Sequence, residues 1–155
     1  MPFRFRLKNL LRHREFKLGE ARTAFAAAES LRMGIVTRIG LLIEKIRSEG
    51  ERFEKEQEAG IDTGFYLYFK DYLANLEREL LQLQRELQKA ARESELRRQA
   101  MIECDKSVKV LENIETRDRE AYDYQLARRD QKKMDEAAVL KDYRDRGPGG
   151  RREGK

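Results

Sequence analysis

Histidine and cysteine are the side chains best suited to acid–base, nucleophilic or metal chemistry, and this sequence has one of each. His13 has no Ser or Cys nucleophile near it in sequence, so we interpret it as a solvated helix residue. Cys104 is interpreted as a small apolar residue on a helix seam rather than as a reactive thiol. No His/Cys cluster has metal-ligand spacing, and no Gly-rich loop of the Walker type is present. The sequence therefore predicts no catalytic residue, metal or cofactor, and a protein that is not an enzyme.

The composition is typical of long helices rather than of a layered globular core. Of the 155 residues, 41% are charged and 39% hydrophobic, with two prolines and no tryptophan. Abundant Ala, Glu, Lys, Leu and Arg with helical periodicity favours a coiled coil. No apolar run is long enough to span a bilayer, and the N-terminus lacks the apolar core of a secretory signal. We expect a cytosolic protein with a reduced cysteine.

Positive charge is concentrated at the start of the chain. The formal net charge is +5, and residues 1–22 carry seven Lys or Arg side chains against two Glu side chains. A basic segment of this kind can contact nucleic acid or anionic lipid, but it can equally be a solvated face or a protein contact.

One short stretch, Gly60-Ile61-Asp62-Thr63-Gly64, predicts a chain reversal. Glycine permits positive φ, and Asp62 and Thr63 are typical helix N-cap residues. On both sides of it, apolar residues recur in alternating steps of three and four, the pattern of a coiled-coil seam. We predict an all-α protein with two long helices in one antiparallel coiled-coil hairpin over residues 1–146. Its parts are a helix from about residue 3 to 58, a turn at 59–64 and a helix from about 65 to 146.

The turn also predicts the register of the hairpin. Folding the chain there pairs seam residues whose numbers sum to about 122, so that large side chains oppose small ones. The pairs include Phe53 with Phe69, Ile46 with Leu76, Leu42 with Leu80, Ile39 with Leu83, Arg32 with Ala90, and Ala28 with Ser94. In this register the paired part of the first helix begins near residue 7. Residues from about 118 to 146 of the second helix therefore have no partner. At 1.5 Å per residue, that is roughly 40 Å of single helix overhanging at the C-terminal end. We expect residues 147–155, a Gly/Arg-rich tail, to be disordered.

Aromatic residues cluster just after the turn. A helix cannot direct Phe65, Tyr66, Tyr68, Phe69 and Tyr72 into one narrow seam. Phe69 fits the seam, and the three tyrosines are expected to be partly exposed. Exposed tyrosines are common anchors for partner proteins, although they can also simply wrap the end of the hairpin.

The chain resembles the FliJ family, the small coiled-coil component of the bacterial flagellar type III export apparatus. The start, Phe3-Arg4-Phe5-Arg6-Leu7, is similar to the opening of the family, and Ala59-Gly60-Ile61 followed by Tyr68, Tyr72 and Leu76-Glu77 is similar to its hairpin tip. The most specific part is the segment Arg129-Asp130-Gln131-Lys132-Lys133-Met134-Asp135-Glu136, which resembles the C-terminal motif of the family.

The resemblance implies an antiparallel coiled-coil stalk similar to the central stalk of rotary ATPases. It also implies which proteins this stalk binds. It implies binding to the hexameric flagellar export ATPase ring through Arg128, Arg129, Gln131, Lys132, Lys133 and Met134. It also implies binding to the export gate protein FlhA through Leu42, Tyr72 and Leu76, and exchange of export chaperones. The implied location is the cytoplasm, peripheral to the inner membrane at the flagellar base, and the implied process is flagellum biogenesis and motility. We expect a monomer in isolation, with no specific nucleic-acid partner and no transmembrane segment.

Two alternatives stay open at this point. One is the equivalent stalk of a virulence type III secretion system, since the same helical architecture would serve it. The other is a coiled coil that binds nucleic acid or a membrane surface through residues 1–22. The predicted gate contact also conflicts with the register, because Leu42 and Leu76 lie on the seam.

Overall fold

The computed structural model describes residues 1–147 and contains two helices, α1 (Lys8–Ala59) and α2 (Thr63–Asp145). The described residues contain no strand. Helix α1 has 52 residues and α2 has 83. The prediction of two long antiparallel helices, the second extending beyond the first, is confirmed. The predicted tail lies outside the described residues except for Gly147.

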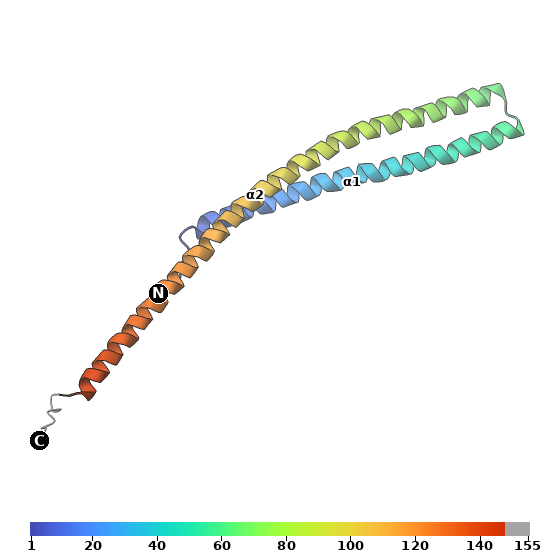
Figure 1. Cartoon of the computed structure of the whole chain (residues 1–155). Coiled ribbons are helices and arrows are strands. Elements are labelled where there is room, and N and C mark those ends of the chain that lie inside the picture. The colour runs from blue at the N-terminus through green and yellow to red at the C-terminus, as the bar shows by residue number, and fades with distance from the viewer. Residues whose placement is uncertain (148–155) are drawn as a thin grey trace, which may run out of the picture. The chain divides into compact units, whose positions relative to one another are not determined.

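The connection between the helices consists of Gly60, Ile61 and Asp62 (Figure 1). Gly60 has a φ of 87°, and its N–H donates a hydrogen bond to the carbonyl oxygen of Gln57 at 3.2 Å. A glycine in this left-handed conformation is the usual residue that ends a helix. Asp62 stands immediately before α2, and its carbonyl oxygen accepts a hydrogen bond from the N–H of Tyr66 at 2.9 Å. The glycine ends α1 and the aspartate precedes α2, so the connection lies inside the predicted turn at 59–64, and α2 starts at Thr63 rather than at about residue 65.

The contacts divide the chain into two compact units, which are described separately. One unit is His13–Ser107, and the other combines Met1–Arg12 with Val108–Lys155. In the first unit, α1 and α2 run antiparallel from the turn. Their buried side chains recur at heptad spacing along each helix and make one long seam: Leu18, Ile35 and Leu42 on α1, and Phe69, Leu76, Leu83, Ala90 and Ser94 on α2.

The register of the seam follows the predicted pairing near the turn. The rings of Phe53 and Phe69 stack with centroids 4.9 Å apart. Leu42, Leu76 and Leu83 form a buried cluster, and Ile39 and Ile46 are among the partly buried side chains packed against it. These residues come from the layers that the sum of 122 pairs. The seam therefore lies where the turn and the heptads predict it.

In the second unit, the first residues of the chain pack against α2 without forming a helix. The prediction of a helix from about residue 3 is wrong, because α1 begins at Lys8. Phe5 is buried, and Phe3 packs on Tyr122 with ring centroids 5.7 Å apart. Extended backbone advances about 3.3 Å per residue, compared with 1.5 Å in a helix, so the non-helical arm reaches farther along α2. The unpaired part of α2 consequently starts after Tyr122 and not near residue 118.

Candidate partner-binding surfaces

The C-terminal part of α2 is the most exposed helical stretch among the described residues. Every residue from Asp123 to Gly147 is exposed. The side-chain contacts found for this stretch are local: the Gln131 amide donates to the Asp135 carboxylate at 2.9 Å, and the Arg128 guanidinium lies 5.9 Å from the centre of the Tyr124 ring. About 35 Å of helix is thus free to contact another molecule along its whole circumference.

The six residues predicted to bind the ATPase ring all lie on this exposed stretch. Helical spacing places Arg128 beside Lys132 and Arg129 beside Lys133, so that four cations cover one side of the helix. Met134 lies on another side and is 68% exposed. The helix thus carries four cations together with Glu136 on one side, and an exposed methionine on another. The assignment of these residues to ring binding stays a prediction.

The three residues predicted to bind the export gate lie together, but two of them are inside the seam. Leu42 is 7% exposed and Leu76 is 5% exposed. Tyr72 is half-buried, packs against their cluster and meets the ring of Phe69 edge-on at 5.9 Å. A partner can reach Tyr72 directly, whereas Leu42 and Leu76 act on that surface only by supporting it from below. The gate contact also stays a prediction.

The end of the hairpin carries further exposed apolar residues. As predicted, Tyr66, Tyr68 and Tyr72 keep part of their surface exposed, and Tyr68 is 69% exposed. Leu67, one residue earlier, is 57% exposed, and the sequence reading did not single it out. Its signal was available, since Leu67 is a large apolar residue outside the seam positions.

Two shallow apolar grooves lie along α1 and were also missed. One of about 630 Å³ runs from Phe16 to Ala27, and one of about 520 Å³ runs from Ala27 to Arg38. Phe16 and Leu31 line them and are each 63% exposed. The stretch 23–37 is also poor in charge, with only Glu29 and Arg32 ionised, in a chain that is 41% charged. Exposed apolar residues in so charged a protein make this part of α1 a candidate contact surface.

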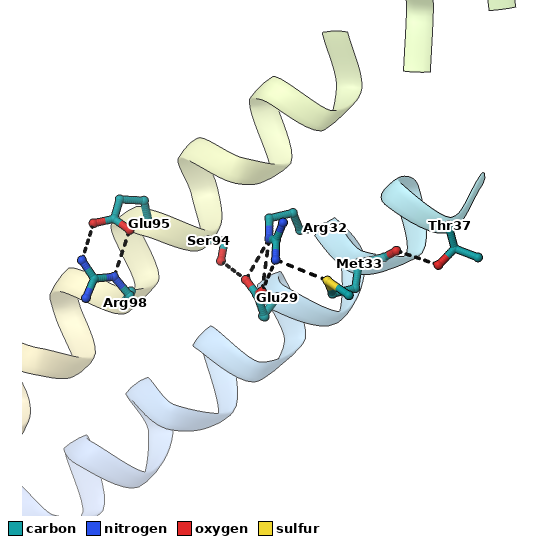
Figure 2. Close-up of polar contacts among 7 residues, drawn as sticks. All are labelled: Glu29, Arg32, Met33, Thr37, Ser94, Glu95 and Arg98. Carbon is teal, nitrogen blue, oxygen red and sulfur yellow. Dashed lines mark hydrogen bonds and ion pairs between the residues drawn. The ribbon is translucent and has the colours of Figure 1, made fainter. Parts of the chain in front are cut away.

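Those two charges belong to a polar layer that joins the helices. Arg32 donates from Nε to both carboxylate oxygens of Glu29, at 3.2 and 3.0 Å, and its Nη2 also contacts Glu29. The hydroxyl of Ser94, a buried residue on α2, donates to the same carboxylate at 2.6 Å. Figure 2 shows Ser94 and Arg32 meeting at Glu29. The hydrogen bond from Arg32, followed by that from Ser94, lowers the pKa of Glu29 to about 2. A polar layer of this kind fixes register in a coiled coil.

At the start of α1 lies a cavity of about 470 Å³. It is lined by Phe3, Arg4, Phe5, Arg6, Lys8, Asn9, Glu115 and Arg119. The sequence reading noted the basic start of the chain but not this concave site. It was not predictable from helix periodicity, because half of the lining precedes α1.

His13 is exposed and Cys104 is half-buried on the side of α2 that faces α1. Among residues 1–147, no group of three or more His, Cys, Asp or Glu side chains is arranged to hold a metal ion. No helix in the same range is long and apolar enough to cross a membrane.

A long antiparallel helical hairpin whose second helix continues as an exposed single helix of mixed charge defines the class: an all-helical, coiled-coil-like protein. The profile of one family, described as the flagellar FliJ protein, matches residues 3–147. The chain belongs to the FliJ family, and this membership makes it a component of the flagellar export apparatus. No curated protein and no solved structure matches the chain.

Proposed function

We propose that this chain is a non-enzymatic coupling stalk that joins a hexameric export ATPase ring to the export gate and so promotes flagellar protein export. The observation that carries the proposal is the exposed stretch of α2 from Asp123 to Asp145, in a chain matched to the FliJ family almost throughout. An isolated helix of this length is marginal in water and gains stability from a partner that surrounds it.

The charge pattern of the stretch suits a ring that changes shape as it works. Arg128, Arg129, Lys132 and Lys133 alternate with Asp130, Asp135 and Glu136. Exposed ion pairs contribute only about 0–1 kcal/mol each, so contacts made by such residues exchange easily. We assign Arg128, Arg129, Gln131, Lys132, Lys133 and Met134 to this ring contact.

We assign the gate contact to the part of the hairpin unit near the turn, at Tyr72 with Leu42 and Leu76 beneath it. Tyr72 supplies the exposed surface, and the two buried leucines hold it in place. The gate protein in this proposal is FlhA, and export chaperones are further exchangeable partners. The site of action in this proposal is the cytoplasmic side of the inner membrane, and the free protein is a monomer.

The test is co-purification with the cognate export ATPase, comparing the full chain with a chain ending after Tyr122. Ending there removes the exposed stretch but keeps the contact of Tyr122 with Phe3. We expect the shortened chain to keep its helical circular dichroism per residue and to lose ring binding and ATPase stimulation. Undiminished stimulation by the shortened chain would refute the proposal.

A second variant separates charge from length. Replacing Arg128, Arg129, Lys132 and Lys133 by Gln should weaken ring binding while leaving the helix exposed. The matched control replaces four exposed cations of α2 that lie far along the chain from the proposed contact: Arg78, Arg85, Lys89 and Arg92. Equal loss in both variants would show that only net charge matters. The same co-purification with a virulence-system ATPase tests the rival stalk, and preferential binding to that ATPase would favour it.

A further inference from the structure

The cavity at the start of the chain is a positively charged concave site. The residues that line it include Arg4, Arg6, Lys8 and Arg119, and Glu115 is the one acidic residue among them. Glu115 is already engaged, since it lies 4.0 Å from the Arg119 guanidinium. Within residues 1–147, no carboxylate lies at ion-pair distance from Arg4, Arg6 or Lys8. Three exposed cations therefore line one cavity and have no carboxylate of the described residues at ion-pair distance.

The arm that carries these cations is held in place rather than free. Phe5 is 6% exposed, and the ring of Phe3 lies between Tyr122 and Arg119, whose guanidinium is 5.4 Å from the ring centre. The hydroxyl of Tyr122 also donates a hydrogen bond to the carbonyl oxygen of Met1. Phe3 holds the arm against α2 and Phe5 is buried, and Arg4 and Arg6 are their immediate neighbours in sequence.

Holding like charges together has an electrostatic cost that a bound anion removes. Arg presents a planar set of donors that matches a phosphate or carboxylate in two-point contacts, and Lys adds a compact charge. A carboxylate neutralises about one cation, whereas a phosphate group has a charge between about −1.5 and −2 and three acceptor oxygens. A phosphate therefore satisfies several of these cations at once. The amide of Asn9, which also lines the cavity, is a further donor.

We propose that this cavity binds a phosphate group through Arg4, Arg6 and Lys8. At about 470 Å³ it has room for the phosphate and part of the molecule that carries it. Acidic phospholipid headgroups and small soluble phosphates share this chemistry, and the experiment distinguishes them. The site lies outside the residues assigned to the ATPase ring and the gate, so it can fail or succeed independently of the proposed function.

The soluble arm of the test titrates the ¹⁵N-labelled full chain with inorganic phosphate, and separately with succinate at the same ionic strength. Amide shifts are expected at residues 3–9 and 115–119 with phosphate, and smaller ones with succinate. The Arg4→Gln/Arg6→Gln/Lys8→Gln variant should bind phosphate at least about tenfold more weakly, because it removes all three cations proposed to hold the anion. Equal shifts with the two anions, or shifts spread over cations along the whole chain, would overturn the proposal.

The lipid arm measures co-flotation of the full chain with phosphatidylglycerol vesicles, using phosphatidylcholine vesicles as the neutral reference. Binding lost in the triple variant identifies the headgroup as the source of the phosphate. Binding to neither vesicle, with soluble phosphate bound, identifies a soluble ligand. If both arms are identical for the wild type and the triple variant, the cavity is not a phosphate site.

Two controls make the outcome specific. The Arg85→Gln/Lys89→Gln/Arg92→Gln variant changes net charge equally, and its phosphate affinity should stay within about twofold of the wild type. Glu115→Gln removes the single carboxylate of the cavity, so it should tighten phosphate binding about two- to fivefold. The second result also guards against misfolding, because a damaged arm cannot bind more tightly. A loss of affinity in either control would contradict the proposal.

Discussion

The rings of Phe53 and Phe69 stack face to face across the seam, 4.9 Å between centroids and 13° between planes. Phe69 is 5% exposed, and Phe65 and Tyr72 lie against its ring as well, each with centroids 5.9 Å away. One side chain thus gathers the aromatic cluster that follows the turn. Truncating it removes the centre of the cluster.

Phe69→Ala should therefore destabilise the chain by about 3 kcal/mol, the lower end of the range for buried Phe→Ala substitutions. The loss comes from the cavity left between Phe53 and Tyr72. Urea unfolding followed by circular dichroism measures it. Tyr68→Ala, at a neighbouring but exposed position, is the control and should change stability by no more than about 0.5 kcal/mol. Similar effects for the two variants would contradict the stacked arrangement.

Gly60 and Gly50 allow the role of the turn to be tested with one kind of substitution. Gly60→Ala places a side chain at a φ of 87° and should cost about 1 kcal/mol. Gly50→Ala lies inside α1, where an added Cβ meets nothing within 4 Å, and should stabilise the chain by up to about 1 kcal/mol. Thermal unfolding of both variants checks the signs. Stabilisation by Gly60→Ala would show that α1 does not end where the structure places its end.

The polar layer at Glu29 predicts a specific dependence on pH. The pKa of Glu29 is lowered to about 2, so the carboxylate contributes stability that is fully present above its unfolded value and is lost as the pH falls through the folded one. The stability difference between the wild type and Glu29→Gln should therefore be constant from pH 7 to about 5 and shrink between about pH 4.5 and 2. Carbon-detected NMR titration of Glu29 checks the pKa directly. Titration near the usual value for Glu would mean that Arg32 and Ser94 do not hold the carboxylate in solution.

Leu42 and Leu76, at the predicted gate surface, are buried. A loss of gate binding after their substitution must therefore be compared with the loss of stability that the same substitution causes. Leu76→Ala should destabilise the chain by about 3 kcal/mol, because Leu76 is one of three buried residues in its cluster. Loss of gate binding in that variant would report loss of the supporting core. Tyr72→Ser removes a half-buried ring, so it should cost less stability while losing as much gate binding. Co-purification with the gate protein at a temperature well below unfolding separates the two effects.

The architecture was predictable from the sequence because the turn and the heptads constrain each other. Gly60 and Asp62 locate the reversal, and the spacing of Leu42, Leu76 and Leu83 then leaves one register in which apolar residues meet. The arm at Phe3 and Phe5 was not predictable in the same way. Its contacts depend on non-helical backbone, whose sequence has no helical repeat from which contacts can be predicted. They also depend on Tyr122, which the heptad pattern does not pair with Phe3.

The candidate surfaces also divide into those that helix periodicity predicts and those that depend on how the N-terminal arm packs. The exposed stretch after Tyr122 follows from counting residues on the two helices, and only its start was misplaced. The cavity around Arg4 needs the path of the arm, which comes from packing of Phe3 and Phe5 and not from the order of charges. Similarly, Arg32 reads in sequence as an isolated charge on the seam, because its partner Glu29 lies outside the heptad positions.

The short turn at Gly60 also has a kinetic consequence. Phe53 and Phe69 are close in sequence, so their contact closes a small loop, whereas the contact of Phe3 with Tyr122 closes a loop of more than a hundred residues. Each layer formed from the turn outward shortens the search for the next one. The helix pairing should therefore form first next to Gly60 and extend away from the turn. The N-terminal arm should fold last and unfold first. Hydrogen exchange should accordingly be slowest in the seam and fastest at the arm, which places the cavity around Arg4 on the least protected part of the paired chain.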